Sequence, residues 1–278
     1  MGGQGLKLGT VPFLNAKPLT LTLENRPDVE LRSEPPARLL PMLESGELDG
    51  ALVSTFAMFH LPGARYVPGV GIASRGRVRS IRLFCRKPPG ELRRVGLDGW
   101  SLSAANMTRV ILKRKWGAEP EFATVDPLRP PREDESFDAF LLIGDNALRE
   151  EAGGLDGVDL GEAWEAFTGL PFLYAVWVFG PGRGDAGKGD AGRSDVETCR
   201  LLREAKEEGM ARLGEIIASA GRDLPYIDEA AARDYLTNCI RYDVGPGEEA
   251  GLRRYYEYLA EDGLAPPEWD AGRAKMEI

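Results

Sequence analysis

The sequence predicts an α/β protein of two lobes. Short strand-like runs alternate with helical patterns from the first residues onward, which is typical of a mostly parallel sheet flanked by helices. The length of 278 residues is near the limit that one hydrophobic core supports, so two domains or lobes are expected. Hydrophobic residues make up 43% of the chain and charged residues 28%, a balance typical of a globular protein.

The elements of the first half follow from apolar spacing and from capping residues. They are, in order, a strand at 6–11, a helix at 36–47, strands at 50–53, 80–86 and 94–97, and a helix at 101–115. Ser54 and Thr55 come directly after a strand, where a helix would begin, and their hydroxyls suit its cap. The helix at 101–115 has Ser101 at its start, basic residues in its last turn and Gly117 just beyond, as the helix dipole favours.

The second half begins with strands and ends in helices. A strand at 138–143 is closed by Gly144 and Asp145, a short helix at 159–167 is ended by Gly169, and 172–179 is the last strong strand. Everything after residue 193 is predicted to be helical, at 195–220, 228–240 and 247–262.

The charge balance excludes two classes of function. With 35 Lys and Arg against 44 Asp and Glu, the net charge is −9, which argues against a nucleic-acid partner because phosphate binding depends on cations. The single histidine, His60, cannot supply the imidazoles that catalytic zinc usually takes, so no metal site is expected. His60 is expected to pack at the end of a helical turn.

Cysteine use and apolar runs indicate the compartment. Cys85, Cys199 and Cys239 are odd in number and far apart, so neither a disulfide framework nor a metal knuckle is expected. The N-terminus carries no signal-peptide pattern, and the longest apolar run, 170–179, is about half of a bilayer span. We therefore expect a cytoplasmic protein without a membrane partner, either a monomer or a homodimer.

A glycine-rich segment at 180–194 contains two nucleotide-binding motifs that we reject. Gly182, Gly184 and Gly187 match GxGxxG, but a second GDAG separates them from the next helix, whose expected cap is Ser194. The GxxxxGK match at 182–188 lacks the Ser or Thr that would hold magnesium. The segment is interpreted as a flexible surface loop.

Polar residues at strand ends are candidates for ligand binding. Side chains that follow strands of open α/β sheets point into the ligand crevice, and Asn15, Ser54 and Thr55 have such positions. Each could equally be a helix cap or turn residue. Ser101 and Ser103 lie at the start of a helix, whose N–H groups and dipole suit a carboxylate, although capping alone would also explain them.

A basic stretch lies ahead of the strand at 80–86. Arg75, Arg77 and Arg79 alternate, so an extended segment would place them on one face. Such a face favours an anionic ligand locally. The alternative is an edge strand protected by its charge. Spacing alone predicts no nucleophile–base pair.

Several segments together resemble a known family, the chorismate dehydratases of the futalosine route to menaquinone. The matching stretches are GTVPFLNAKPL (9–19), SGELDGALVS (45–54), GVGIASRGRVRSIRLF (69–84), FDAFLLIGDNAL (137–148), DLGEAWEAFTGLPFLYAVWVF (159–179) and YLTNCIRYDVGPGEEAGLRRYYEYLAEDGL (235–264). They cover most of the chain in the family's order.

The resemblance implies a type II periplasmic-binding-protein fold, with the ligand held between two α/β lobes. Strands at 81–86 and 174–179 would cross between the lobes, so that lobe 1 comprises 1–83 and 178–278 and lobe 2 comprises 84–177. The family removes water from chorismate to give 3-[(1-carboxyvinyl)oxy]benzoate. This hydro-lyase reaction needs no metal or organic cofactor.

The resemblance also implies site residues. Asn15 and Ser80 match the family's polar cleft residues and are expected to be catalytic. Substrate binding is expected from eight residues: Ser54, Thr55, Arg77, Arg79, Ser101, Ser103, Gly144 and Asp145. One departure is plain, because Leu102 stands where the family often has an Arg, which affects the expected substrate affinity.

Two alternatives stay open. One is a sister enzyme on the same fold, the 1,4-dihydroxy-6-naphthoate synthase, although the 13–19 and 76–84 segments are more similar to the dehydratase. The other is a non-catalytic solute-binding or sensing protein for a small carboxylate, which would bind chorismate and release it unchanged.

Overall fold

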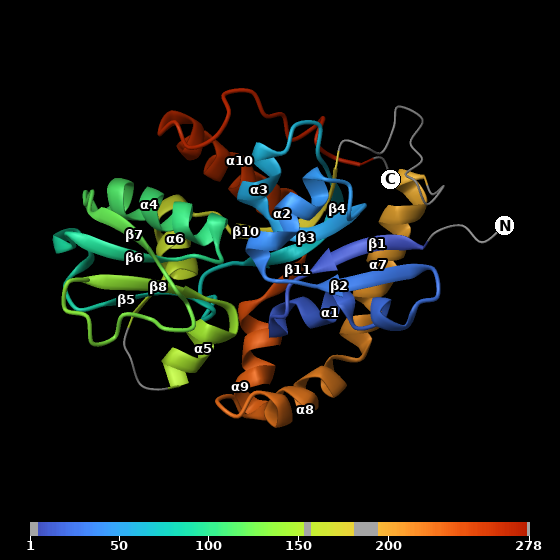
Figure 1. Ribbon diagram of the computed structural model, residues 1–278, viewed down its shortest axis with the longest axis horizontal. Helices are drawn as coiled ribbons and strands as arrows, with labels where there is room; N and C mark the ends of the chain where they lie inside the picture. The colour runs from blue at the N-terminus through green and yellow to red at the C-terminus, as the bar shows by residue number, and fades with distance from the viewer. Residues whose placement is uncertain (1–4, 153–156, 181–193, 277–278) are drawn as a thin grey trace.

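The chain folds into two lobes, each built around its own β-sheet (Figure 1). The computed structural model describes residues 5–152, 157–180 and 194–276. Among these residues the strands form one sheet of six strands and one of five. The predicted α/β class and the division into two lobes are confirmed.

Lobe 1 contains the six-stranded sheet, whose strand order is β11-β4-β10-β3-β1-β2. Its strands are β1 (Leu6–Thr10), β2 (Val29–Ser33), β3 (Gly50–Ser54), β4 (Arg65–Ser74), β10 (Phe172–Phe179) and β11 (Arg241–Asp243). β1 pairs in parallel with β2 on one side and β3 on the other, while β10 runs antiparallel to both β3 and β4. The order of strands therefore reverses at β1, where open α/β sheets bind ligands.

The helices before residue 65 are short and belong to lobe 1. They are α1 (Lys17–Thr20), α2 (Pro36–Glu44), α3 (Thr55–His60) and the 3₁₀ turns Leu14–Ala16 and Leu23–Asn25. Ser54 caps α3 as predicted, because its Oγ accepts the Ala57 N–H at 3.3 Å.

Lobe 2 contains the five-stranded sheet, in the order β7-β6-β8-β5-β9. Its elements are β5 (Ile81–Cys85), a 3₁₀ turn (Pro89–Glu91), β6 (Arg94–Asp98), α4 (Leu102–Trp116), β7 (Glu121–Val125), β8 (Ala139–Ile143), α5 (Gly144–Ala152), β9 (Gly157–Asp159) and α6 (Leu160–Thr168). β6 pairs in parallel with β7 and β8, and β5 is antiparallel to β8. This arrangement repeats that of lobe 1, and β6 takes the place of β1.

The passages between the lobes differ from those expected. The expected boundaries cut through β5 and β10, but β5 lies wholly in the five-stranded sheet and β10 wholly in the six-stranded one. The chain instead passes between the sheets at 75–80 and at 169–171. The apolar runs of these two strands could not show which lobe each belongs to, because a buried strand has the same apolar pattern in either sheet.

The 75–80 passage is a turn, which corrects the expectation of an extended segment with its arginines on one face. Arg79 has a φ of 60°, in the left-handed region that a non-glycine residue seldom adopts. The Asp159 carboxylate stabilises this conformation by accepting the Val78 N–H at 3.1 Å and the Arg79 N–H at 2.7 Å. The same carboxylate caps α6 through the N–H groups of Gly161 and Glu162.

The C-terminal third is mostly helical, with two corrections. It contains α7 (Asp195–Ala211), α8 (Leu213–Asp223), α9 (Glu229–Asp234), a π-helix (Tyr235–Cys239) and α10 (Pro246–Glu261). The helix expected at 195–220 is broken at Arg212, whose φ of −100° and ψ of 16° lie outside the helical region, and Figure 1 shows α8 turning away from α7. The strand β11 (Arg241–Asp243) lies between the π-helix and α10. It was missed because three residues are too few to show an alternation of apolar and polar side chains.

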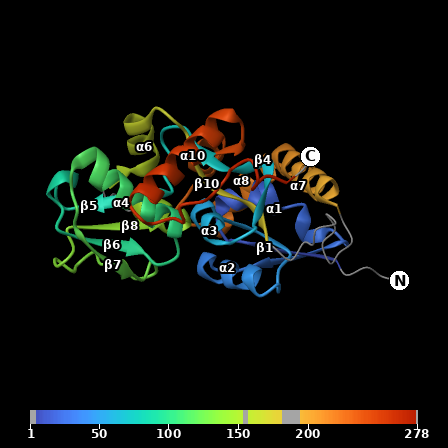
Figure 2. The ribbon, with the colours of Figure 1, turned by 90° about the horizontal axis from the view of Figure 1, so that it is seen from above.

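α10 packs across both lobes (Figure 2). On lobe 1 it lies against β10, and on lobe 2 it contacts α4. The Tyr255 hydroxyl donates to the Ser103 carbonyl at 2.9 Å, and Asp262, just after α10, accepts from Lys113 at 2.9 Å and Arg114 at 3.0 Å. In the described residues, no helix is long and apolar enough to cross a membrane.

Close approach of α10 to the 169–171 passage requires a glycine at position 251. A Cβ there would lie 2.0 Å from the Pro171 carbonyl oxygen, which is backbone and cannot easily yield. We expect Gly251→Ala to lower the free energy of unfolding by roughly 1–3 kcal/mol, measured by chemical denaturation. The matched control is Gly247→Ala on the same helix, whose Cβ would lie 3.6 Å from Pro171 Cγ and which should not destabilise. Equal losses in the two variants would contradict the packing argument.

Candidate active site

A cavity of about 310 Å³ lies between the two lobes. It opens outside the carboxyl ends of β1 and β3 in lobe 1 and of β6 and β8 in lobe 2. The lining residues that follow these four strands are Val11, Phe13 and Asn15 after β1, Ser54 and Ala57 at β3, Gly99 to Ala104 after β6, and Ile143 and Gly144 at β8. Both points at which the strand order reverses therefore face the same space, as expected for a ligand site.

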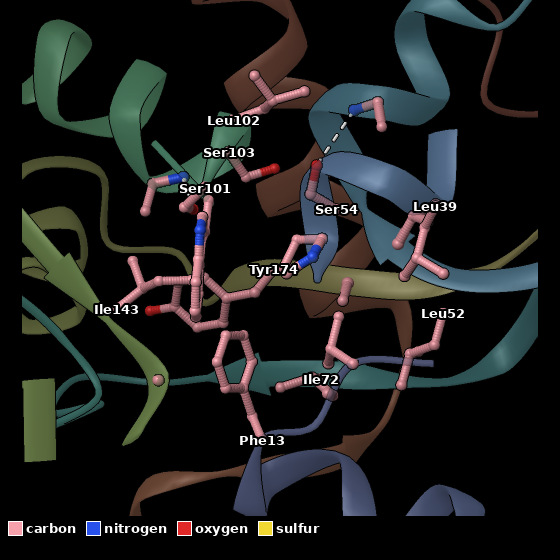
Figure 3. A pocket seen from close by; sticks show the side chains of 18 of the residues that line it. Phe13, Leu39, Leu52, Ser54, Ile72, Ser101, Leu102, Ser103, Ile143 and Tyr174 are labelled. Carbon is pink, nitrogen blue, oxygen red and sulfur yellow. Dashed lines mark hydrogen bonds between the residues drawn. The ribbon is translucent and has the colours of Figure 1, made fainter. Parts of the chain in front are cut away.

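The walls of the cavity are mainly apolar (Figure 3). Figure 3 shows Phe13, Leu39, Leu52 and Ile72 on the lobe 1 side and Ile143 and Leu102 on the lobe 2 side, with Tyr174 between them. The Tyr174 hydroxyl is hydrogen-bonded to Ser74 at 2.8 Å, so the tyrosine presents mainly its ring. Among the described lining residues there is no charged side chain.

Ser54 and Ser101 provide hydroxyl donors at the cavity. The Ser101 Oγ accepts the Ala104 N–H at 3.1 Å and caps α4, as Ser54 caps α3. A serine hydroxyl whose oxygen accepts a backbone N–H keeps its own hydrogen available to donate. Both serines line the cavity, so each can donate to an anion there, next to the positive end of a helix dipole.

Thr55 and Ser103, both expected to bind substrate, contact each other where the two lobes meet. The Ser103 Oγ accepts the Phe56 N–H at 2.9 Å and lies 3.4 Å from the Thr55 Oγ1. The Thr55 hydroxyl donates to the Leu173 carbonyl at 3.0 Å, which leaves its oxygen to accept from Ser103. Ser103 lines the cavity and Thr55 does not, but the hydrogen bonds of both are taken up within the protein.

Asn15 and Ser80 meet at the cavity from different parts of the chain. Asn15 lies in the 3₁₀ turn after β1, and Ser80 ends the 75–80 passage. The Ser80 backbone is fixed on both sides, since its N–H donates to Val78 and its carbonyl accepts the Gly144 N–H, each at 2.7 Å. The Asn15 Oδ1 is buried and makes no hydrogen bond of good geometry with any described residue.

Gly144 lines the cavity at the start of α5, and its neighbour Asp145 does not. Gly144 has a φ of +56°, and a Cβ there would lie 2.7 Å from the Phe13 ring, so only glycine fits. The Asp145 Oδ1 accepts the Leu14 N–H at 3.2 Å and thereby ties lobe 2 to the turn that holds Asn15. Burial raises the pKa of Asp145 to about 6, although that hydrogen bond and Arg149 oppose the rise.

Arg77 and Arg79 do not line the cavity, which corrects the expectation that they hold a carboxylate. Arg79 Nε donates to Glu151 at 2.8 Å and its Nη1 to the Ala231 carbonyl at 3.2 Å. Arg77 pairs with Glu151 at 3.4 Å and with Asp234 at 4.0 Å. The basic stretch therefore joins α5 to α9 as an ion-pair network.

Two carboxylates that support the cavity were missed. Asp98 accepts the N–H groups of Trp100 at 2.7 Å and Ile143 at 3.1 Å, so it fixes the ends of β6 and β8 where they line the cavity. Burial raises its pKa to about 6. The second is Asp159, which holds the 75–80 passage and caps α6. Each Asp is the last residue of a strand that precedes a helix, and this position could have identified both as residues that bind backbone N–H groups.

Comparison with known proteins identifies the family. A model of the menaquinone biosynthesis family matches residues 6–261. The chain belongs to this family. A curated member from Thermus thermophilus, described as chorismate dehydratase, is 29% identical over 247 residues, which cover 81% of this chain and 84% of the relative.

Solved structures bear out the fold that the family resemblance implied. A protein from Archaeoglobus fulgidus is similar with a TM-score of 0.73 and 18% identity, covering 94% of this chain and 98% of its own. The periplasmic aliphatic sulphonate binding protein of Escherichia coli is similar with a TM-score of 0.67 and 14% identity, covering 100% and 93%. The periplasmic-binding-protein fold predicted for this family member is therefore confirmed.

The rejected glycine motifs at 182–188 lie outside the described residues, as does most of the 180–194 segment. Its expected end, the helix cap at Ser194, is confirmed by a capping box with Glu197. His60 stacks on Phe56, at 4.4 Å between ring centroids, and is not among the cavity residues. Within 5–152, 157–180 and 194–276, no group of His, Cys, Asp or Glu could hold a metal ion.

The raised pKa of Asp145 makes a pH-dependent contribution to stability. Between the ordinary pKa of 3.8 and the folded value of about 6, the unfolded chain ionises while the folded carboxyl stays protonated, so unfolding becomes easier as the pH rises. Asp145→Asn keeps an acceptor for the Leu14 N–H but does not titrate. We expect its free energy of unfolding, relative to the parent, to rise by roughly 1–3 kcal/mol from pH 4 to pH 7 in denaturation experiments. A constant difference would contradict this.

Proposed function

We propose that this protein is a chorismate dehydratase of menaquinone biosynthesis, acting by the futalosine route in the cytoplasm. The substrate would be chorismate, and the products 3-[(1-carboxyvinyl)oxy]benzoate and water. Membership of the menaquinone biosynthesis family over 6–261 and similarity to the Thermus enzyme support this proposal.

One observation on this chain itself supports the proposal. Asn15 and Ser80 are 65 positions apart in sequence, and both line the cavity between the lobes. These are the residues that match the family's polar cleft positions. They approach from the turn after β1 and from the passage between the lobes, and they face apolar walls that suit a six-membered carbon ring.

The reaction is an elimination whose atoms balance without another reactant. The C–H bond at the ring carbon bearing the enolpyruvyl ether breaks, and its electrons form a ring double bond. The C–O bond to the ring hydroxyl breaks in turn, and hydroxide leaves with the released proton as water. The ring becomes aromatic, which makes the step strongly downhill, so the protein supplies mainly orientation and proton handling.

The two polar residues have different proposed roles. Asn15 orients the substrate by hydrogen bonds, since an amide is too weak a base to remove a carbon-bound proton. The proton acceptor is the side-chain carboxylate of the substrate. Ser80 binds one carboxylate or the ring hydroxyl, from a backbone that is fixed at both its N–H and its carbonyl.

Neutral donors would bind the two substrate carboxylates. The Ser54 and Ser101 hydroxyls each retain a hydrogen to donate, and α4 and α5 begin at the cavity with Leu102 and Gly144. Exclusion of water by the apolar walls strengthens each of these interactions. Substrate charge would therefore be balanced by hydroxyls and by the positive ends of helix dipoles.

Turnover of chorismate tests the proposal. We expect the purified protein to convert chorismate to a product lighter by one water, detected by mass spectrometry. Asn15→Ala and Ser80→Ala should each lower kcat/KM by about 100-fold or more, because each removes a group that orients the substrate. Asn25→Ala and Ser136→Ala, at exposed positions, are matched controls that should keep the parent rate.

Two outcomes would contradict the proposal. Chorismate that binds but is recovered unchanged would indicate a solute-binding or sensing protein. Near-normal turnover by Asn15→Ala would contradict the role proposed for Asn15, while the dehydratase activity itself would still be supported.

Leu102 offers a second test, because it lines the cavity at the start of α4 without a charge. Leu102→Arg would place a cation where the family often has one. We expect it to lower the KM for chorismate by about 10-fold, equivalent to about 1.4 kcal/mol. Leu102→Gln, which has comparable reach without charge, is the control and should change KM much less. An unchanged KM in both variants would mean that position 102 does not approach a carboxylate.

A further inference from the structure

Two helices of lobe 2 are bonded to lobe 1 through the second residue of each. Ser103 is the second residue of α4, and its Oγ accepts the N–H of Phe56, in the first turn of α3, at 2.9 Å. Asp145 is the second residue of α5, and its Oδ1 accepts the N–H of Leu14, in the turn after β1, at 3.2 Å. Each contact therefore joins a backbone group that follows a lobe 1 strand to a side chain that follows a lobe 2 strand.

The Ser103 contact lies beside two hydroxyls of the cavity. On lobe 1, Phe56 is two residues after the cap Ser54. On lobe 2, Ser103 is two residues after the cap Ser101, and in Figure 3 its hydroxyl points toward the Ser54 side of the cavity. The buried Ser103 also accepts from the Tyr255 hydroxyl of α10 through its carbonyl, at 2.9 Å. The spacing of one hydroxyl donor from each lobe therefore depends on Ser103.

The Asp145 contact lies beside the other polar groups of the cavity. Leu14 directly precedes Asn15 in the same 3₁₀ turn. Asp145 directly follows Gly144, whose N–H donates to the Ser80 carbonyl at 2.7 Å. The contact thus holds the turn that contains Asn15 against the segment that is bonded to Ser80.

Both contacts oppose a change in the angle between the lobes. Lobes joined by short passages, here 75–80 and 169–171, can turn relative to each other unless other contacts prevent it. A rotation that widens the cavity would lengthen the Ser103 and Asp145 contacts. When only a fraction of a protein has the conformation that binds, the apparent affinity is reduced by that fraction. Contacts that keep the lobes at one spacing therefore strengthen binding without touching the ligand.

We propose that Ser103 and Asp145 are paired positioning residues, which hold the polar groups of the two lobes at the spacing that the substrate requires. The inference rests on the proposed function, which supplies the identity of that substrate. In this role each side chain accepts a backbone N–H of lobe 1, and neither has to contact the substrate.

Kinetics of Ser103→Ala test the first contact. We expect KM for chorismate to rise by about 10-fold and kcat to change less than about threefold, because fewer free molecules are competent to bind while the bound complex is the same. The matched control is Thr108→Val on the same helix, which removes a buried hydroxyl that donates to the Ala104 carbonyl of α4 itself, at 2.7 Å. It should keep the parent KM. An unchanged KM in Ser103→Ala, or equal rises in both variants, would overturn the proposal.

Two substitutions of Asp145 test the second contact. Asp145→Ala should raise KM by about 10-fold, again with kcat changed less than about threefold. Asp145 does not line the cavity, so a lost substrate contact would not explain the rise. Asp145→Asn retains an oxygen that can accept the Leu14 N–H, and it should return KM to within about threefold of the parent value. A KM as high in Asp145→Asn as in Asp145→Ala would overturn the proposal.

Hydrogen exchange gives a result that does not depend on turnover. If the two contacts act together, Ser103→Ala should speed exchange of the Leu14 amide as well as the Phe56 amide by about 10-fold or more, although the Leu14 bond to Asp145 is not altered. The amide of Leu8, within β1, is the reference for global unfolding and should not change.

The exchange result separates this inference from the proposed function. Faster exchange at Phe56 alone, or equally faster exchange at Leu8, would overturn the inference even if chorismate is converted. Faster exchange at both Leu14 and Phe56 in a protein that does not convert chorismate would support the positioning role and contradict the proposed function alone.

Discussion

Four backbone N–H groups converge on the buried carboxylate of Asp159, two from the passage between the lobes and two from the first turn of α6. Hydrogen bonds to a charged acceptor are roughly twice as strong as neutral ones, which offsets the left-handed backbone of Arg79. That conformation ends the passage at Ser80, whose carbonyl then accepts the N–H at the start of α5. One side chain thus holds both the passage that ends at Ser80 and the first turn of α6.

The distribution of charge around the cavity follows from the cost of desolvation. A cation facing an apolar cavity would lack a partner whenever the cavity is empty, and a buried charge without a partner is costly. Here Arg77, Arg79 and Arg82 are paired instead with Glu151. The hydroxyl oxygens of Ser54 and Ser101 each accept a backbone N–H group within the protein. Neutral capping residues therefore provide donors at the cavity without burying a charge there.

Features that depend on neighbouring residues could be predicted from the sequence, and features that depend on distant partners could not. The caps at Ser54, Ser101 and Ser194 and the helix ends at Gly117 and Gly169 follow from local chemistry, and all are found. β4 was missed because Pro68, Gly69 and Gly71 are residues that strands disfavour. The partners of Arg79 lie more than 70 positions away, and Thr55 and Ser103 are 48 apart, so their pairing could not be seen. Asn15 and Ser80 came as a pair from the family resemblance, since spacing alone left Asn15 among several candidates and did not single out Ser80.

The position of β10 has a consequence for biosynthesis. This strand lies between β3 and β4 in the six-stranded sheet, yet it is synthesised after the whole of lobe 2. Residues 81–168 are contiguous and can form their sheet as soon as they leave the ribosome. β3 and β4 must wait, with apolar edges open to incorrect pairing, until residue 179 has emerged. Lobe 2 is thus the part of the nascent chain that can fold first. Until β10 is inserted, the open edges of β3 and β4 make the chain prone to aggregation.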